Sequence, residues 1–170
     1  MYYTNSEREK NALQEAQALR LAASQISKIK KVISDFDGKI YNCRFDEAIN
    51  NLRNENIVIG SYVDSYGYFN IYVSDRHSAN NITLLRCKKA TKDEERPYFT
   101  DAKRIKADAM IEQLNYKYGE LLKSASEIEE TVKDIKNKIN QLESLKKSMN
   151  AIISTIPAEV ANIYRINHIY

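Results

Sequence analysis

The sequence has little of what tight turns, disulfides and metal sites require. Its 170 residues include four glycines, two prolines, two cysteines, two histidines and no tryptophan. So few turn residues argue against a many-stranded sandwich, a barrel or a Gly-rich phosphate-binding loop. Cys43 and Cys87 are too few and too far apart for a disulfide framework or a metal knuckle. We expect two free thiols, with one long-range bridge as the alternative, and no resident metal or cofactor.

Long apolar runs and a strong charge imbalance are also missing. No stretch of about 18 apolar residues occurs, and the N-terminus has no apolar segment, so we expect a cytoplasmic protein that does not enter a membrane. The 26 basic and 23 acidic residues give a net charge of +3 and are mixed along the chain. That balance argues against a basic module for duplex nucleic acid. With 43 % hydrophobic residues, the composition is that of a globular chain, here a single domain over residues 1–170.

What the sequence does contain is helical periodicity at both ends. Residues 6–36 begin with a capping-box pair, Ser6 and Glu9, and end at Asp37-Gly38. Between them apolar residues recur every three or four positions, which predicts one long helix. These residues are Ala12, Ala16, Leu19, Ala22, Ile26, Ile29, Ile33 and Phe36.

The second periodic segment, residues 100–156, is longer. Its apolar residues alternate strictly at spacings of four and three, which predicts a coiled-coil helix. They are Ala107, Ile111, Leu114, Tyr118, Leu121, Ala125, Ile128, Val132, Ile135, Ile139 and Leu142. Thr100 is the expected N-cap, and a phase shift near Leu145 is expected to disturb the supercoil. Pro157 begins a C-terminal tail, 157–170.

Residues 39–99 have the pattern of a β region. Asn42 precedes a short amphipathic helix over 43–53, and runs rich in Ile, Val and Tyr predict strands at 57–63, 68–74 and 82–88. Asp64-Ser65-Tyr66-Gly67 is typical of a hairpin loop, and residues 39–41 could add a fourth strand.

Together these elements predict an α+β fold. Two long antiparallel coiled-coil helices would form a stalk that flanks a small antiparallel β-meander with one short helix, and the β region would sit at the tip of the stalk. The order of helix, hairpins and helix is similar in arrangement to that of prefoldin subunits. The short helix and the Tyr-rich strands depart from that arrangement.

The second helix exceeds the first by about 25 residues, or roughly 37 Å at 1.5 Å per residue. Its surplus heptads have no partner within the chain unless the tail folds back. We therefore expect self-association, most simply a homodimer. The residues expected to form the contact are Ile128, Val132, Ile135, Ile139 and Leu142.

Alternation along the strands gathers aromatic and basic residues on one side of the sheet, because side chains point to opposite faces in turn. Phe69, Ile71 and Val73 belong to the apolar face, whereas Ile82, Leu84, Arg86 and Lys88 share the other side of the third strand. We call the polar side the tyrosine face. It holds Tyr62, Tyr68, Tyr72, Arg86 and Lys88, and Tyr66 stands in the adjoining loop.

The tyrosine face has three interpretations. Its tyrosines can pack as core with only their hydroxyls wet, form a protein-binding hot spot, or stack single-stranded nucleic acid. We take all six residues as candidate partner-binding residues.

No catalytic constellation is evident. His77 stands in a loop beside Asp75 and Arg76, and a hydrolase using this histidine is the least favoured hypothesis, because a base needs an oriented partner. Asn, Ile, Lys and Tyr are abundant and have AT-rich codons, which indicates a low-GC bacterium or its bacteriophage. We therefore expect a non-enzymatic, oligomeric coiled-coil interaction protein, an accessory factor of a phage or mobile element that binds and inhibits a host protein through the β tip or the tyrosine face. The alternative is a single-stranded nucleic-acid-binding protein.

Overall fold

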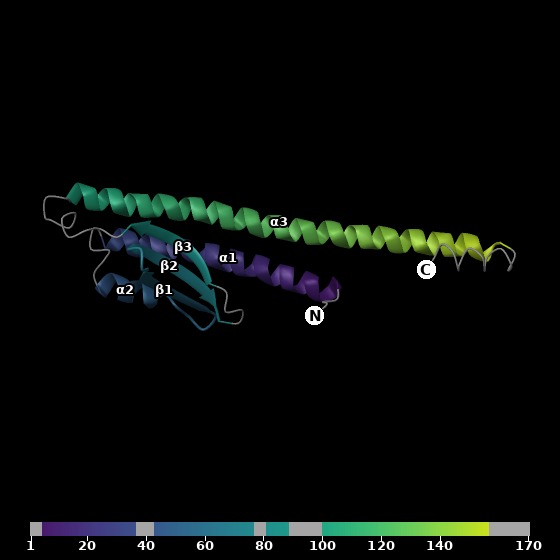
Figure 1. Ribbon diagram of the computed structural model, residues 1–170, viewed down its shortest axis with the longest axis horizontal. Helices are drawn as coiled ribbons and strands as arrows, with labels where there is room; N and C mark the ends of the chain where they lie inside the picture. The colour runs from purple at the N-terminus through teal and green to yellow at the C-terminus, as the bar shows by residue number, and fades with distance from the viewer. Residues whose placement is uncertain (1–4, 37–42, 77–80, 89–99, 157–170) are drawn as a thin grey trace. The chain divides into compact units, whose positions relative to one another are not determined.

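The computed structural model describes residues 5–36, 43–76, 81–88 and 100–156 (Figure 1). Its elements follow in the order α1 (Asn5–Asp35), α2 (Cys43–Asn50), β1 (Ile57–Val63), β2 (Tyr68–Asp75), β3 (Asn81–Lys88) and α3 (Thr100–Ser154). The chain divides into two compact units, Met1–Ile128 and Glu129–Tyr170. Whether both belong to a single domain stays a prediction.

The α+β class and the two long helices flanking a small sheet are confirmed. The three strands form one antiparallel sheet in the order β1-β2-β3. The predicted strand ends agree with the structure to one residue, whereas α2 ends at Asn50 rather than at residue 53. The helix stop at Gly38, the fourth strand at 39–41 and the tail 157–170 lie outside the described residues. Coiled-coil geometry of the helices stays a prediction.

The register of the sheet contains one irregularity that the alternation rule did not predict. Ile71 of β2 pairs with Leu85, but the next residue, Tyr72, pairs with Thr83, so that Leu84 has no partner across the ladder. A bulge of this kind inserts one residue and reverses the face of everything beyond it. Leu84 and Leu85 are consequently both buried. The assignment of Ile82 and Leu84 to the tyrosine face was wrong.

The core of the first unit lies between the apolar face of the sheet and the helices. Phe45 of α2 is in ring contact with Phe36 at 5.6 Å and with Phe69 at 5.8 Å between centroids. These contacts close the core at the α2 end. The other buried residues of the cluster come from α1, α2, the three strands and the first turns of α3; they are Ala22, Ala23, Ile26, Ile29, Ile33, Ile49, Ile57, Ile59, Ile71, Val73, Leu84, Leu85, Ala107, Met110, Leu114 and Leu121.

Within this unit α3 runs antiparallel to α1. Arg20 of α1 donates a hydrogen bond to Ser126 at 3.1 Å, and Lys30 donates one to Asn115 at 2.8 Å, so residue numbers rise on one helix as they fall on the other.

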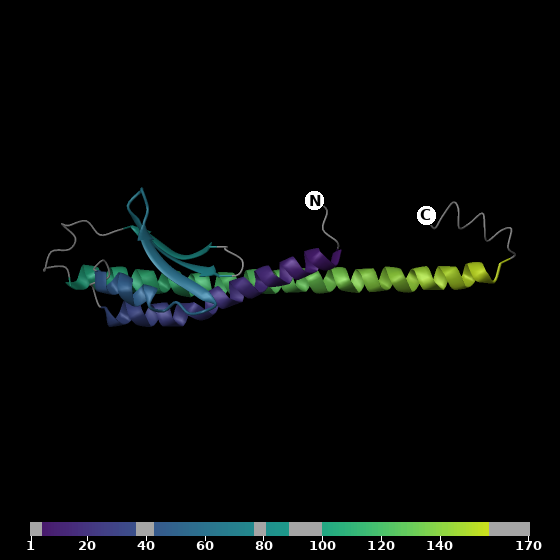
Figure 2. The ribbon, with the colours of Figure 1, turned by 90° about the horizontal axis from the view of Figure 1, so that it is seen from below.

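The sheet lies alongside the helix pair, not beyond its end as a tip (Figure 2). Gln113, well inside α3, accepts a hydrogen bond from β3, and core residues of α3 extend to Leu121. An α3 that faces both α1 and β3 buries a broader stripe than one heptad seam. This explains why Met110 is buried although the predicted seam omitted it. Tyr118, which the seam included, is 45 % exposed. The β region is better described as a side layer.

The second unit begins at Glu129 and contains the remainder of α3. Its large apolar side chains are mostly exposed, among them Ile135, Leu142, Leu145, Met149 and Ile152. No helix in the described part of the chain has both the length and the apolar character needed to cross a lipid bilayer.

Candidate protein-interaction face

The strand register places the predicted residues of the tyrosine face together. Tyr62 of β1 pairs with Asn70 of β2, which pairs with Arg86 of β3. Tyr68 pairs with Lys88 at the neighbouring position. Directly opposed residues of an antiparallel pair point to the same side, so these side chains form one surface. Beyond the bulge Tyr72 pairs with Thr83, which adds a threonine that alternation had assigned to the other side.

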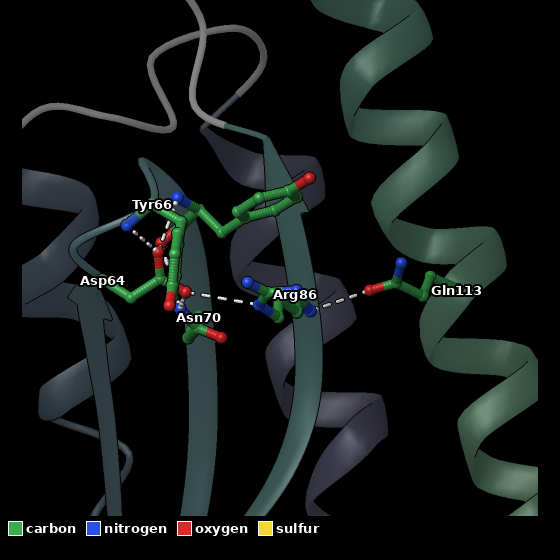
Figure 3. A network of polar contacts seen from close by, with 6 residues as sticks. Asp64, Tyr66, Asn70, Arg86 and Gln113 are labelled. Carbon is green, nitrogen blue, oxygen red and sulfur yellow. Dashed lines mark hydrogen bonds and ion pairs between the residues drawn. The ribbon is translucent and has the colours of Figure 1, made fainter.

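Asp64, in the loop between β1 and β2, organises this surface (Figure 3). One carboxylate oxygen, Oδ1, accepts hydrogen bonds from the backbone N–H groups of Tyr66 and Tyr68 at 2.9 and 3.0 Å. The other, Oδ2, accepts from Asn70 Nδ2 and Arg86 Nε, both at 3.2 Å. A single carboxylate thus ties the loop to β2 and β3.

The loop itself is a tight turn. Gly67 N–H donates to the Asp64 carbonyl at 3.1 Å, and Gly67 has φ of 82°, a left-handed conformation that a Cβ disfavours. Tyr66, at the third position of the turn, is left 81 % exposed. The turn therefore presents a tyrosine to solvent on a fixed backbone.

The charge of Asp64 is favoured by this environment. Burial raises the pKa of the Asp64 carboxyl, but hydrogen bonds from Tyr68, Asn70, Tyr66 and Arg86 lower it by more. The pKa of Asp64 therefore lies below its ordinary value, and the carboxylate stays ionised at neutral pH.

Asn70 and Gln113 support the surface from below and from the side. Asn70 is 2 % exposed, and its side-chain Nδ2 donates hydrogen bonds to Asp64 Oδ2 and, at 3.0 Å, to the Tyr68 carbonyl. Gln113 Oε1 of α3 accepts the backbone N–H of Arg86 at 2.9 Å, which occupies a donor on the outer edge of β3 (Figure 3). Occupied edge donors are not available to pair with a foreign strand.

The side chain of Arg86 stacks on an aromatic ring. Its guanidinium carbon lies 3.9 Å from the centroid of the Tyr68 ring, a cation–π geometry. The same side chain is ion-paired with Asp64, so its charge is partly offset. Arg86 thus acts as a bridge between the loop and the sheet surface.

Tyr72 and Tyr62 form the other half of the face. Their rings meet edge to face with centroids 5.9 Å apart. Tyr72 lies over Gly60, where a Cβ would stand only 2.5 Å from the Tyr72 hydroxyl oxygen. An open depression of about 340 Å³ adjoins these rings and is lined by Ser61, Tyr62, Tyr72, Asn81 and Thr83.

Sequence reasoning found the tyrosines and bases but missed the residues that hold them. Asp64 had a usable signal, because Asp is favoured at the first position of a turn. Asn70 also had one, because Asn is depleted within strands. Nothing in the sequence indicated Gln113.

Other chemistry has little support in the described residues. They contain no group of three or more His, Cys, Asp or Glu side chains placed to hold a metal ion. Cys43 and Cys87 are both free thiols. His77 lies outside the described residues.

No family model matches the chain, and neither a curated protein nor a solved structure matches it.

Proposed function

We propose that the chain is a non-enzymatic interaction protein that binds another protein through the tyrosine face and the adjoining loop. The observation that carries the proposal is a group of exposed side chains at one end of the face. Tyr62 is about half exposed, and Tyr66 is 81 % exposed. Tyrosine provides much of the binding energy at protein interfaces, because it combines a large apolar ring with a hydroxyl group.

Preorganisation supports the same proposal. The loop that carries Tyr66 is fixed by the four hydrogen bonds of Asp64, and Tyr68 is held beneath Arg86. Binding by a surface that is already ordered loses less conformational entropy.

The stacking of Arg86 on Tyr68 is the observation that favours the alternative, binding of single-stranded nucleic acid. Such binding also needs cations that can neutralise phosphates. Arg86 is already paired with Asp64 at 3.2 Å, so a phosphate would have to compete with a carboxylate. Protein binding is therefore the first choice.

We predicted from the sequence that the partner is a host protein and that binding inhibits it. Both statements stay predictions.

Affinity capture with matched tyrosine variants tests the proposal. The double variant Tyr62→Ser with Tyr66→Ser removes two rings from the face. The control, Tyr116→Ser, removes a ring that is 75 % exposed on α3. We expect a protein captured from lysate of the source cell by the wild type to be retained by the control and lost with the double variant. Capture of the same proteins by all three chains would contradict the proposal.

A measurement of nucleic-acid binding distinguishes protein binding from the alternative function. Fluorescence anisotropy with a labelled oligothymidine at low salt should show no binding. Binding that weakens steeply with added salt and is lost in the double variant would favour the alternative.

A further inference from the structure

The part of α3 in the second unit presents a row of apolar side chains to solvent. Ile135, Leu142, Leu145, Met149 and Ile152 are between 49 and 65 % exposed, and they follow one another at spacings of seven, three, four and three. Val132 and Ile139 fill the remaining positions of the same row and are partly exposed. Soluble monomers rarely expose so many large apolar groups in one contiguous surface.

Charged residues of this part of α3 are distributed unequally along the helix. Between residues 129 and 134 there are three acids, Glu129, Glu130 and Asp134, and one base, Lys133. Residues 135–154 contain one acid, Glu143, and four bases, which are Lys136, Lys138, Lys146 and Lys147. The first segment thus has a net charge of −2 and the second of +3.

We propose that a second copy of the chain packs on this row in antiparallel orientation. Antiparallel pairing brings the acidic segment of each copy toward the basic segment of the other. Parallel pairing in register would place acids beside acids and lysines beside lysines. The charge pattern therefore selects both the occupant and its direction.

Antiparallel pairing of identical helices has two-fold symmetry. The same residues are used by both copies, and the contact closes at two chains. The face on the sheet belongs to the first unit, so this inference is independent of the proposed function.

Light scattering of the full-length chain tests the pairing. We expect a mass of twice 19.7 kDa at micromolar concentration. Ile135→Lys with Leu142→Lys should lower the mass to that of one chain. The matched control, Asn137→Lys with Ser144→Lys, adds the same charge at the same spacing on the side of the helix that faces away from the row, and it should remain dimeric. A monomeric wild type, or a dimer unaffected by the first pair, would overturn the proposal.

Spin labels test the direction. A single label on Ser154→Cys, with Cys43→Ser and Cys87→Ala, reports the distance between equivalent positions in the dimer. With the overlap centred near residue 140, we expect about 40 Å between the labels in the antiparallel dimer. A distance below about 20 Å is the parallel result and would refute the assigned direction.

Truncation after Ile156 tests whether the C-terminal tail, and not a second copy of the chain, covers the apolar row. If the full-length chain is monomeric and the truncated chain dimeric, the C-terminal tail covers the row in the full-length chain, and the proposal is wrong. An equal dimeric mass for both chains agrees with it.

Discussion

Both parts of α3 carry apolar residues three, four or seven positions apart, but the environments of these residues are opposite. In the first part Leu114 is fully buried, and Ala107, Met110, Leu121 and Ala125 are buried with it. In the second part Leu142 is 65 % exposed. Heptad spacing therefore specifies an apolar stripe on a helix but not what covers it. In the first unit the cover is α1 and the sheet; for the second unit we propose another copy of the chain.

The same substitution made in both parts of α3 tests this comparison most strongly. Leu114→Ala should lower the free energy of unfolding by about 3 kcal/mol, because it leaves a cavity in a packed core. Leu142→Ala should change it by less than about 0.5 kcal/mol in dilute solution, where the chain is monomeric. Urea unfolding of both variants at nanomolar concentration measures the difference. Equal losses would show that the second part is also packed within the chain.

A second pair of substitutions compares a crowded glycine with an open one. Gly60→Ala should destabilise the chain by about 1 kcal/mol, because the new methyl group displaces the Tyr72 ring from β1. Gly119→Ala, on α3 with nothing within 4 Å of its Cβ position, should stabilise it by about 0.5–1 kcal/mol.

Thermal unfolding measures the stability of both glycine variants. The NMR signals of the Tyr72 ring report whether the ring is displaced. If Gly60→Ala leaves those signals unchanged, the close packing of Tyr72 on β1 is wrong.

The smallest effect concerns pH. The folded-state pKa of Asp64 is below its unfolded value of about 3.9. The stability that this carboxylate contributes is therefore present above pH ~4 and is lost as the pH falls through the folded-state pKa. Asp64→Asn should be less stable than the wild type at pH 7, and the difference should shrink as the pH falls below about 4. Denaturation midpoints from acidic to neutral pH measure this, and a difference that is constant over that range would contradict the role given to Asp64.

The sequence predicts which segments form helices and strands better than it predicts which parts of the chain pack against them. Strand ends follow from runs of Ile, Val and Tyr bounded by turn residues, and helix ends follow from caps and spacing. The bulge at Leu84 does not follow. Regular pairing would bury one leucine of the Leu84-Leu85 pair and bulged pairing buries both, so only the packing of the neighbouring strand and helices decides between them. The position of the sheet along the helices depends on contacts between distant residues, such as Gln113 and Arg86.

The same limit applies to the tyrosine face. Period-2 alternation predicted that Tyr62, Tyr68, Tyr72, Arg86 and Lys88 share a side, and the register agrees. It did not predict that Arg86 is ion-paired with Asp64, which weakens the nucleic-acid interpretation. Pairing across 22 positions depends on the turn geometry and on the strand register together.

Hydrogen exchange along α3 tests the difference between its two parts most directly. Amides in residues 107–125 should be protected equally at nanomolar and at micromolar concentration, because their cover lies within the chain. Amides in residues 132–152 should become protected only at the higher concentration, because their cover is a second copy. Protection of both segments that does not change with concentration would contradict the central claim.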